Sequence, residues 1–275
     1  MINKSIDFQN FFVEIENFSN IDIKIENSIG TIVLSRSEKH NALNDIMINE
    51  LTNAFSYLGK NSSVKIIVLK SDGQSFCAGA DLSYLQKLSN FSLDENHEDS
   101  KKLLRLFKLI YEIKKIVIAV VSGAAIAGGC GLATVCDFIF ASKENAKFGY
   151  TESKIGFIPA IVMIFLTKKI GEGKTREMIL SGKIYSAIES EKIGLVNFLC
   201  NEIEIEKLAY EFATNLIEQN SFSSLVASKE MLCNINNMNF NQALDYAAMM
   251  NAVVRMSPDC KRGITAFLNK EKIEW

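Results

Sequence analysis

Two glycine-rich turns are the places in this sequence where residue type and spacing could do chemistry. The first, FCAGADL at residues 76–82, follows a predicted strand and puts an acid at the start of a helix. The second follows the apolar run at residues 117–121 and contains Ser122-Gly123 and Gly128-Gly129. Backbone N–H groups at a helix start lack internal partners, so each turn can offer one to a polarised oxygen. Together the turns predict an oxyanion hole for one carbonyl oxygen.

An acidic side chain follows the second turn, in the segment GYTESKIGFIP. Glu152 stands there beside Ile155, Phe157 and Ile158, which are predicted to form the apolar floor of a pocket. Burial beside apolar groups disfavours the charged carboxylate and raises its pKa, which suits proton exchange with a substrate carbon. A glutamate taken alone is most often a solvated surface residue, so a role for Glu152 in proton transfer depends on the family resemblance described below.

Strand and helix patterns must position these residues. Apolar runs predict buried strands at residues 64–69 and 117–121, and alternation around Asn27-Ser28 predicts a hairpin over residues 21–34. A helical stripe covers residues 41–60, with Asn44 or Asp45 as its cap. These elements predict a mixed α/β arrangement around the two turns.

The rest of the chain is mostly helical in pattern. Residues 84–99 are polar and acidic and are interpreted as a mobile loop or a loosely packed helix near the site. GEGKT at residues 171–175 lacks the glycine at 168 that a phosphate-binding loop needs, and is interpreted as an interhelical turn. Further helices are predicted at residues 103–115, 162–170, 204–219, 223–234, 240–255 and 259–269.

Composition limits the function classes. The chain has 275 residues, 48% of them hydrophobic, and a net charge of −2, so it can bury a large core but offers no basic field to nucleic acid. Six cysteines and two histidines lack metal-ligand spacing, which indicates reduced thiols, no metal site and a cytoplasmic protein. The uncharged run at residues 116–136 is broken by Ser122 and four glycines, so a strand, turn and helix are predicted there instead of a membrane span.

FCAGADL, AIAGGCGLA and FGYTESKIGFIPA together resemble the crotonase superfamily, the enoyl-CoA hydratases and isomerases, from about residue 22 to residue 275. The resemblance implies an α/β fold, a crotonase spiral of β-β-α repeats with a helical C-terminal trimerisation region. The expected division is an N-terminal arm at residues 1–20, a catalytic core at residues 21–200 and a helical oligomerisation region at residues 201–275. A homotrimer or a dimer of trimers is expected.

The resemblance also assigns roles at the turns. It gives the oxyanion-hole amides to Ala80 and Gly128 and the proton transfer to Glu152. The sequence departs from the family at Gly131, where a second catalytic glutamate is expected. Candidates to position a water in its place are Tyr84, Tyr150, Thr151 and Glu112.

An acyl-CoA thioester is the implied partner. Ser83 stands where a phosphate-contacting lysine is common in the family, and Lys87 is the alternative. The implied substrate- and CoA-binding residues are Lys39, His40, Ala42, Leu43, Ala78, Asp81, Leu82, Gly129, Gly131, Thr151, Phe267 and Lys270.

The motif pattern is closest to bacterial methylglutaconyl-CoA hydratases. The expected activity is hydration of a 2-enoyl-CoA in leucine or fatty-acid breakdown, without metal or redox cofactor, since coenzyme A enters as part of the substrate. One alternative is an enoyl-CoA Δ3,Δ2-isomerase that uses Glu152 alone. Another is a non-catalytic member of the fold that binds acyl-CoA or RNA.

Overall fold

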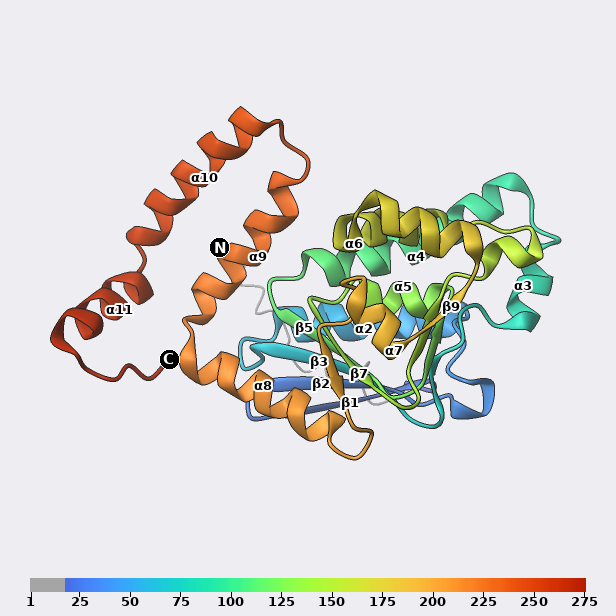
Figure 1. Cartoon of the computed structure of the whole chain (residues 1–275), viewed down its shortest axis with the longest axis horizontal. Helices are drawn as coiled ribbons and strands as arrows, with labels where there is room; N and C mark the ends of the chain where they lie inside the picture. The colour runs from blue at the N-terminus through green and yellow to red at the C-terminus, as the bar shows by residue number, and fades with distance from the viewer. Residues whose placement is uncertain (1–17) are drawn as a thin grey trace, which may run out of the picture.

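Two sheets of unequal size carry the described part of the chain, residues 18–275, in this computed structural model (Figure 1). The six-stranded sheet has the order β1-β2-β3-β5-β7-β10, and the four-stranded sheet has the order β4-β6-β8-β9. The predicted N-terminal arm lies outside the described residues, apart from positions 18–20.

The large sheet begins with a tight hairpin. β1 (Ile21–Glu26) pairs antiparallel with β2 (Ile29–Leu34), with Glu26 opposite Ile29. The two connecting residues, Asn27 and Ser28, have φ of 51° and 62°. A two-residue turn with both φ values positive has the twist that hairpins prefer. The predicted hairpin is confirmed.

Beyond the hairpin the chain passes repeatedly from the large sheet to the small one. β3, β5 and β7 are parallel neighbours in the large sheet, and β4, β6 and β8 are parallel neighbours in the small sheet. Each coil of chain therefore stacks on the one before, which confirms the spiral that the resemblance implies. The strands are β3 (Ile66–Ser71), β4 (Ser75–Cys77), β5 (Ile116–Val121), β6 (Ala124–Ile126), β7 (Phe138–Ser142), β8 (Lys147–Gly149), β9 (Ile184–Ser186) and β10 (Phe198–Cys200).

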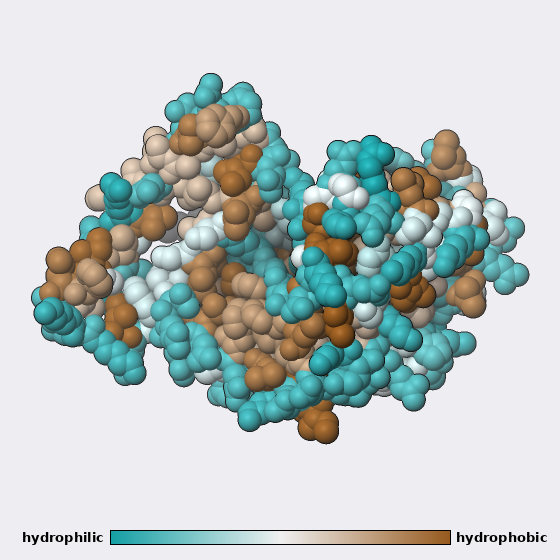
Figure 2. Space-filling model, in the orientation of Figure 1, coloured by the Kyte–Doolittle hydropathy of each residue, from teal (hydrophilic) through white to brown (hydrophobic). Residues whose placement is uncertain are grey.

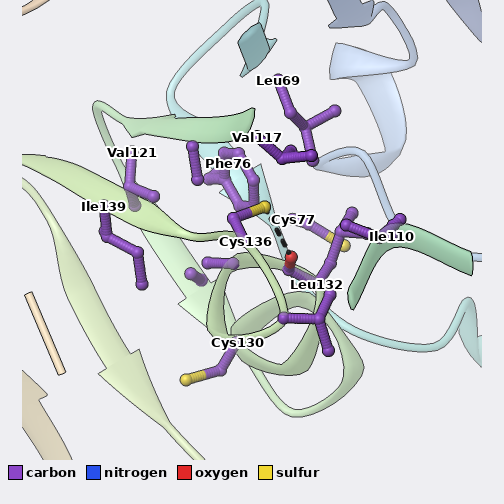
Figure 3. Close-up of a cluster of buried hydrophobic side chains, with 14 of the residues drawn as sticks. Leu69, Phe76, Cys77, Ile110, Val117, Val121, Cys130, Leu132, Cys136 and Ile139 are labelled. Atoms are coloured by element: carbon purple, nitrogen blue, oxygen red, sulfur yellow. Dashed lines mark hydrogen bonds between the residues drawn. The ribbon is translucent and has the colours of Figure 1, made fainter. Parts of the chain in front are cut away.

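Helices cover both faces of the large sheet. On one face, α2 (Asp45–Lys60), α4 (Leu93–Glu112) and α5 (Gly128–Thr134) enclose the main core, part of which appears in Figure 3. There Leu69, Val117 and Val121 of the large sheet belong to the same buried cluster as Leu132 of α5. On the other face α8 (Ile205–Gln219) packs on a second apolar cluster. Strands buried on both faces read as continuous apolar runs, as predicted for residues 117–121.

Residues 84–99, interpreted from the sequence as either a mobile loop or a loosely packed helix, are mostly helical. Residues 84–88 belong to α3 (Leu82–Leu88) and residues 93–99 to the start of α4, with a four-residue turn at 89–92 between them, so the helical interpretation is confirmed for most of the segment and the loop interpretation is wrong. α4 begins ten residues earlier than predicted because Ser92 and Glu95 form a capping box.

Shorter elements complete the core. α6 (Ala160–Ser181) is interrupted at Gly171, whose φ is 76°, as the predicted interhelical turn requires. The 3₁₀ turns η1 (Ser37–Lys39) and η2 (Glu152–Ile155) and the short helix α7 (Ala187–Lys192) connect the strands.

Three helices leave the sheets and form a projecting C-terminal arm, residues 222–275 (Figure 1). It contains α9 (Phe222–Ile235), α10 (Phe240–Arg255) and α11 (Pro258–Asn269). Lys229 of α9 joins it to the core, because its buried ammonium lies 2.7 Å from the Asp137 carboxylate and donates to the Lys115 carbonyl. Figure 2 shows apolar side chains, in brown, along the arm. They are Leu232, Phe240, Leu244, Met249, Val253, Met256, Ile264, Phe267 and Leu268, all exposed.

The predictions about a membrane span and about the cysteines can be followed in the described residues. Between residues 18 and 275, no helix combines the length and the apolar character needed to cross a membrane. The run at residues 116–136 forms β5, β6 and α5, as predicted. All six cysteines are free thiols.

Candidate active site

Each of three successive parallel strands of the small sheet is followed by one predicted catalytic residue. Ala80 follows β4, Gly128 follows β6 and Glu152 follows β8. The carboxyl ends of neighbouring parallel strands lie on the same side of a sheet, where ligands bind in many α/β folds. All three residues line one cavity of about 400 Å³.

The first turn is fixed by a bridge to Leu43. Leu43 N donates to the Gly79 carbonyl at 2.7 Å, and Asp81 N donates to the Leu43 carbonyl at 2.8 Å. In such a parallel bridge the residue between the two bonded neighbours points its own amide away. Ala80 N accordingly donates no hydrogen bond within residues 18–275, and Ala80 lines the cavity.

Asp81 holds the same turn from behind. Its carboxylate caps α3 by accepting from Ser83 N and Tyr84 N, and lies 2.8 Å from the Arg36 guanidinium. The hydrogen bond from the Ser83 hydroxyl, aided by Arg36, lowers the pKa of Asp81 to about 2. Asp81 is buried and is not among the cavity-lining residues, so its carboxylate stabilises the turn.

The second turn presents the Gly128 amide at the start of α5. Ala127 precedes it with φ 52° and ψ −123°, a strained backbone conformation for a residue with a side chain, and its N–H bonds to the Gly149 carbonyl. Gly128 N, at the first helical position, donates no hydrogen bond in the described chain. A Cβ built on Gly79 would lie 3.7 Å from Gly128 N, so the two turns adjoin.

Glycine is required at position 129 by close approach of two backbones. A Cβ there would lie 2.7 Å from both the carbonyl carbon and the Cβ of Cys77, closer than real side chains come. Gly129 therefore lets α5 approach β4 and brings the two free amides together.

Glu152 brings a buried carboxyl group to the cavity. Its side chain is 8% exposed, and its Oε2 atom has no hydrogen-bond partner in the described structure. Burial raises the pKa of Glu152 above its ordinary value of 4.5. A carboxyl group that is buried, unpaired and harder to ionise suits proton transfer.

The apolar residues after Glu152 are not the pocket floor that was predicted. Ile155, Phe157 and Ile158 line the cavity but are 69%, 55% and 64% exposed, so they form its rim. The 3₁₀ turn η2 ends at Gly156, and the chain runs outward there before α6 begins.

Val162 of α6 closes the space next to Gly131. A Cβ on Gly131 would overlap Val162 Cγ1 and would lie 3.0 Å from Val162 Cβ and 3.2 Å from the Phe107 ring. Val162 lines the cavity and Gly131 does not. The position of the expected second glutamate is therefore filled by a valine side chain.

The structure separates the other predicted binding residues into groups. Leu43, Ala78, Leu82 and Thr151 line the cavity. Ala42 is buried, and Lys39 and His40 lie on the exposed turn after Arg36. Phe267 and Lys270 lie at the end of α11, on the opposite side of the molecule from α3 (Figure 1).

The candidates for positioning a water also separate. Tyr84 lines the cavity and its hydroxyl donates to Asp99, another lining residue. Tyr150 is fully buried against Thr134, and Glu112 lies on the surface with Lys108, so neither reaches the cavity.

Sequence reasoning missed many of the lining residues, among them Ala127, Val162 and Asp99. A signal existed for Asp99, which stands four residues before Leu103 and seven before Leu106, on the inward stripe of α4. The prediction started that helix too late to include it.

The spiral thus brings two unpaired amides and a buried carboxyl group to one cavity. The chain belongs to the enoyl-CoA hydratase/isomerase family, whose model matches residues 24–275. This family and the observed fold place it in the crotonase superfamily, as the sequence predicted.

Individual relatives agree with this placement. The chain is 36% identical over 245 residues to a putative enoyl-CoA hydratase of Thermus thermophilus, covering 88% of this chain and 95% of that protein. It is 30% identical over 261 residues to a crotonyl-CoA hydratase of Syntrophomonas wolfei, covering 93% and 97%. The crystal structure of an enoyl-CoA hydratase from Shewanella pealeana superimposes with a TM-score of 0.90 at 26% identity, covering 96% of this chain and 99% of that one.

Packing of Gly131 against Val162 predicts the effect of a small substitution. Gly131→Ala gains about 1 kcal/mol of helix propensity but overpacks the site at a cost of about 1–3 kcal/mol, so the variant should be less stable. Adding Val162→Ala removes the overlapping methyl group and should restore most of the loss. Urea denaturation of the parent, both single variants and the double variant measures the coupling; additive effects would contradict the contact.

Burial of Glu152 predicts a pH-dependent stability. The pKa of Glu152 in the folded protein lies above 4.5, so the folded protein binds a proton at this carboxyl group more tightly than the unfolded chain does. The free energy of unfolding therefore falls as pH rises from about 4.5 through the pKa of the folded state. Glu152→Gln should therefore be more stable than the parent at pH 7, with the difference vanishing below about pH 4. Melting temperatures at fixed protein concentration test this.

Glu112→Gln is the matched control. Glu112 is exposed and lies 3.9 Å from Lys108, a helix pair worth about 0.3–0.5 kcal/mol. A stabilisation by Glu152→Gln that is equal at all pH values would show that ionisation is not its cause.

Proposed function

We propose that this enzyme adds water to a 2-enoyl-CoA thioester. The observation that carries the proposal is the convergence of Ala80 N, Gly128 N and the Glu152 carboxyl group on one cavity. A thioester carbonyl gains negative charge when it becomes an enolate, and two fixed amides stabilise that charge without reorganising. The names of the relatives, putative enoyl-CoA hydratase and crotonyl-CoA hydratase, support hydration.

In the proposed reaction Glu152 carries one proton between water and substrate. The carboxylate takes a proton from water as the water oxygen bonds to C3, and the C2–C3 double bond becomes an enolate whose oxygen accepts from Ala80 N and Gly128 N. The protonated Glu152 then returns the proton to C2, and the thioester carbonyl re-forms. No metal or redox cofactor enters these steps.

A double-bond isomerase is the second candidate. The packing of Val162 on Gly131 favours it, because that contact leaves no place for a second carboxylate beside Glu152. Moving a proton between two carbons needs one acid–base group, whereas hydration also needs an oriented water. In the hydratase proposal, the cavity hydroxyl groups of Tyr84 and Thr151 are available to orient that water.

An isotope experiment decides between hydration and isomerisation. The enzyme is incubated with a 2-enoyl-CoA and, separately, with a 3-enoyl-CoA in ¹⁸O-water, and the products are analysed by mass spectrometry. We expect ¹⁸O at C3 of a 3-hydroxyacyl-CoA. Glu152→Gln should lower the rate by about 10²- to 10⁴-fold, while Glu112→Gln should leave it unchanged. Double-bond migration without ¹⁸O incorporation would overturn the hydratase proposal.

We also infer a homotrimer or a dimer of trimers built through the C-terminal arm. α10 buries none of its side chains in the single chain, and the exposed apolar residues of the arm need cover. Light scattering at micromolar concentration should give about three or six times 30.7 kDa. Leu244→Lys should lower that mass, whereas Ile203→Lys, at an apolar residue 96% exposed outside the arm, should not. A monomeric parent protein would refute assembly.

A further inference from the structure

The cavity contains two acidic side chains and no cation to pair with them. Among residues 18–275, its lining includes Asp99 and Glu152 but no lysine, arginine or histidine. Most of the other lining side chains are apolar, among them Leu85, Leu88 and Leu103 on the wall that α3 and α4 form. Apart from the amides of Ala80 and Gly128, the described lining therefore has no positively charged side chain that would attract an anion.

Asp99 is fixed on that wall by Tyr84. The Tyr84 hydroxyl donates a hydrogen bond to Asp99 Oδ1, which holds the carboxyl group against the wall. Burial of Tyr84, together with the bond to Asp99, raises the pKa of the phenol, so it remains a donor. The charge of a third carboxyl group, Asp45, also raises the pKa of Tyr84.

Two of the cations that follow Asp99 on α4 are engaged with Glu98. Glu98 binds Lys101 at 2.7 Å and lies 3.9 Å from Arg105 on the exposed face of the helix. Lys102, three residues after Asp99, is not a lining residue of the cavity, and no ion pair of Asp99 is found within residues 18–275. An anionic ligand in the cavity would therefore meet the Asp99 charge with no cation among the lining residues to compensate it.

We propose that Asp99 determines specificity by excluding acyl chains that end in a carboxylate, so that the site takes uncharged acyl chains. The inference rests on the proposed function, because it requires the acyl chain of a CoA thioester to enter this cavity. Two like charges within a partly buried site repel strongly enough to lower affinity by about 10- to 100-fold. By this argument methylglutaconyl-CoA, which carries a second carboxylate, is a poor substrate despite the motif resemblance.

Two unreactive thioesters of equal shape test the proposal. Glutaryl-CoA ends in a carboxylate, and 5-methylhexanoyl-CoA ends in an uncharged isopropyl group of the same form. Isothermal titration calorimetry with the parent protein should give at least about tenfold tighter binding of 5-methylhexanoyl-CoA. Asp99→Asn keeps an acceptor for Tyr84 and removes the charge, so the affinity ratio should fall by about tenfold.

Matched controls separate charge from shape and from folding. Asp94→Asn, on the exposed face of the same helix and outside the cavity lining, should leave the ratio unchanged. Circular dichroism checks that each variant is folded. Added salt should reduce the preference of the parent protein if charge causes it.

The outcomes distinguish this inference from the proposed function. An unchanged ratio in folded Asp99→Asn, or equal binding of both thioesters to the parent protein, would overturn the role of Asp99. Failure of both thioesters to bind would instead contradict the proposed acyl-CoA site. Binding of both with a charge-dependent preference supports both proposals.

Discussion

The site depends on keeping two peptide N–H groups out of the hydrogen-bond network of the fold. At Ala80 the bonds of Gly79 and Asp81 to Leu43 turn the intervening amide toward the cavity. At Gly128 the amide has no partner because it stands at the start of α5, directly after the positive φ of Ala127. Ala80 is exposed and Gly128 is half-buried, and both line the cavity. Under the proposed function both donors are already oriented when substrate arrives, which is the condition for stabilising an oxyanion.

The spiral explains why these groups meet. Successive coils place β4, β6 and β8 side by side, so residues far apart in sequence emerge at one end of the small sheet. Contact between coils is close enough that Gly129 has no room for a side chain against Cys77. The arrangement of these three groups is thus a property of how the coils stack, and helices outside the sheets add the walls of the cavity.

What the sequence could predict depended on whether the signal was local. The hairpin at Asn27-Ser28 and the buried run at residues 117–121 follow from turn chemistry and burial, and both are confirmed. The strand-to-helix turns predicted one free amide each, and the family resemblance assigned these amides to Ala80 and Gly128. Contacts between separate elements carry no such local signal, so the valine on Gly131 was not foreseen.

The exposure of the apolar residues after Glu152 could not be predicted from the local sequence either. Ile155, Phe157 and Ile158 were expected to form a floor because apolar side chains are usually buried, but they line a rim. Hydrophobic residues at the mouth of a cavity are exposed in the single chain and can become covered when a ligand or another subunit binds. The sequence shows that such residues are apolar, but it does not show whether the fold itself or a bound molecule buries them.

The contact between Gly131 and Val162 constrains how this site could change during evolution. A glutamate at position 131 would collide with the valine, and shortening the valine first would leave a void under the cavity wall. Each single step is therefore disfavoured, and only the pair of changes would open space for a second acid. A protein with Gly131 and Val162 could therefore gain a second acid at position 131 only through a single-substitution variant that is less stable. One glutamate can remain fixed there by packing alone, without selection on the reaction.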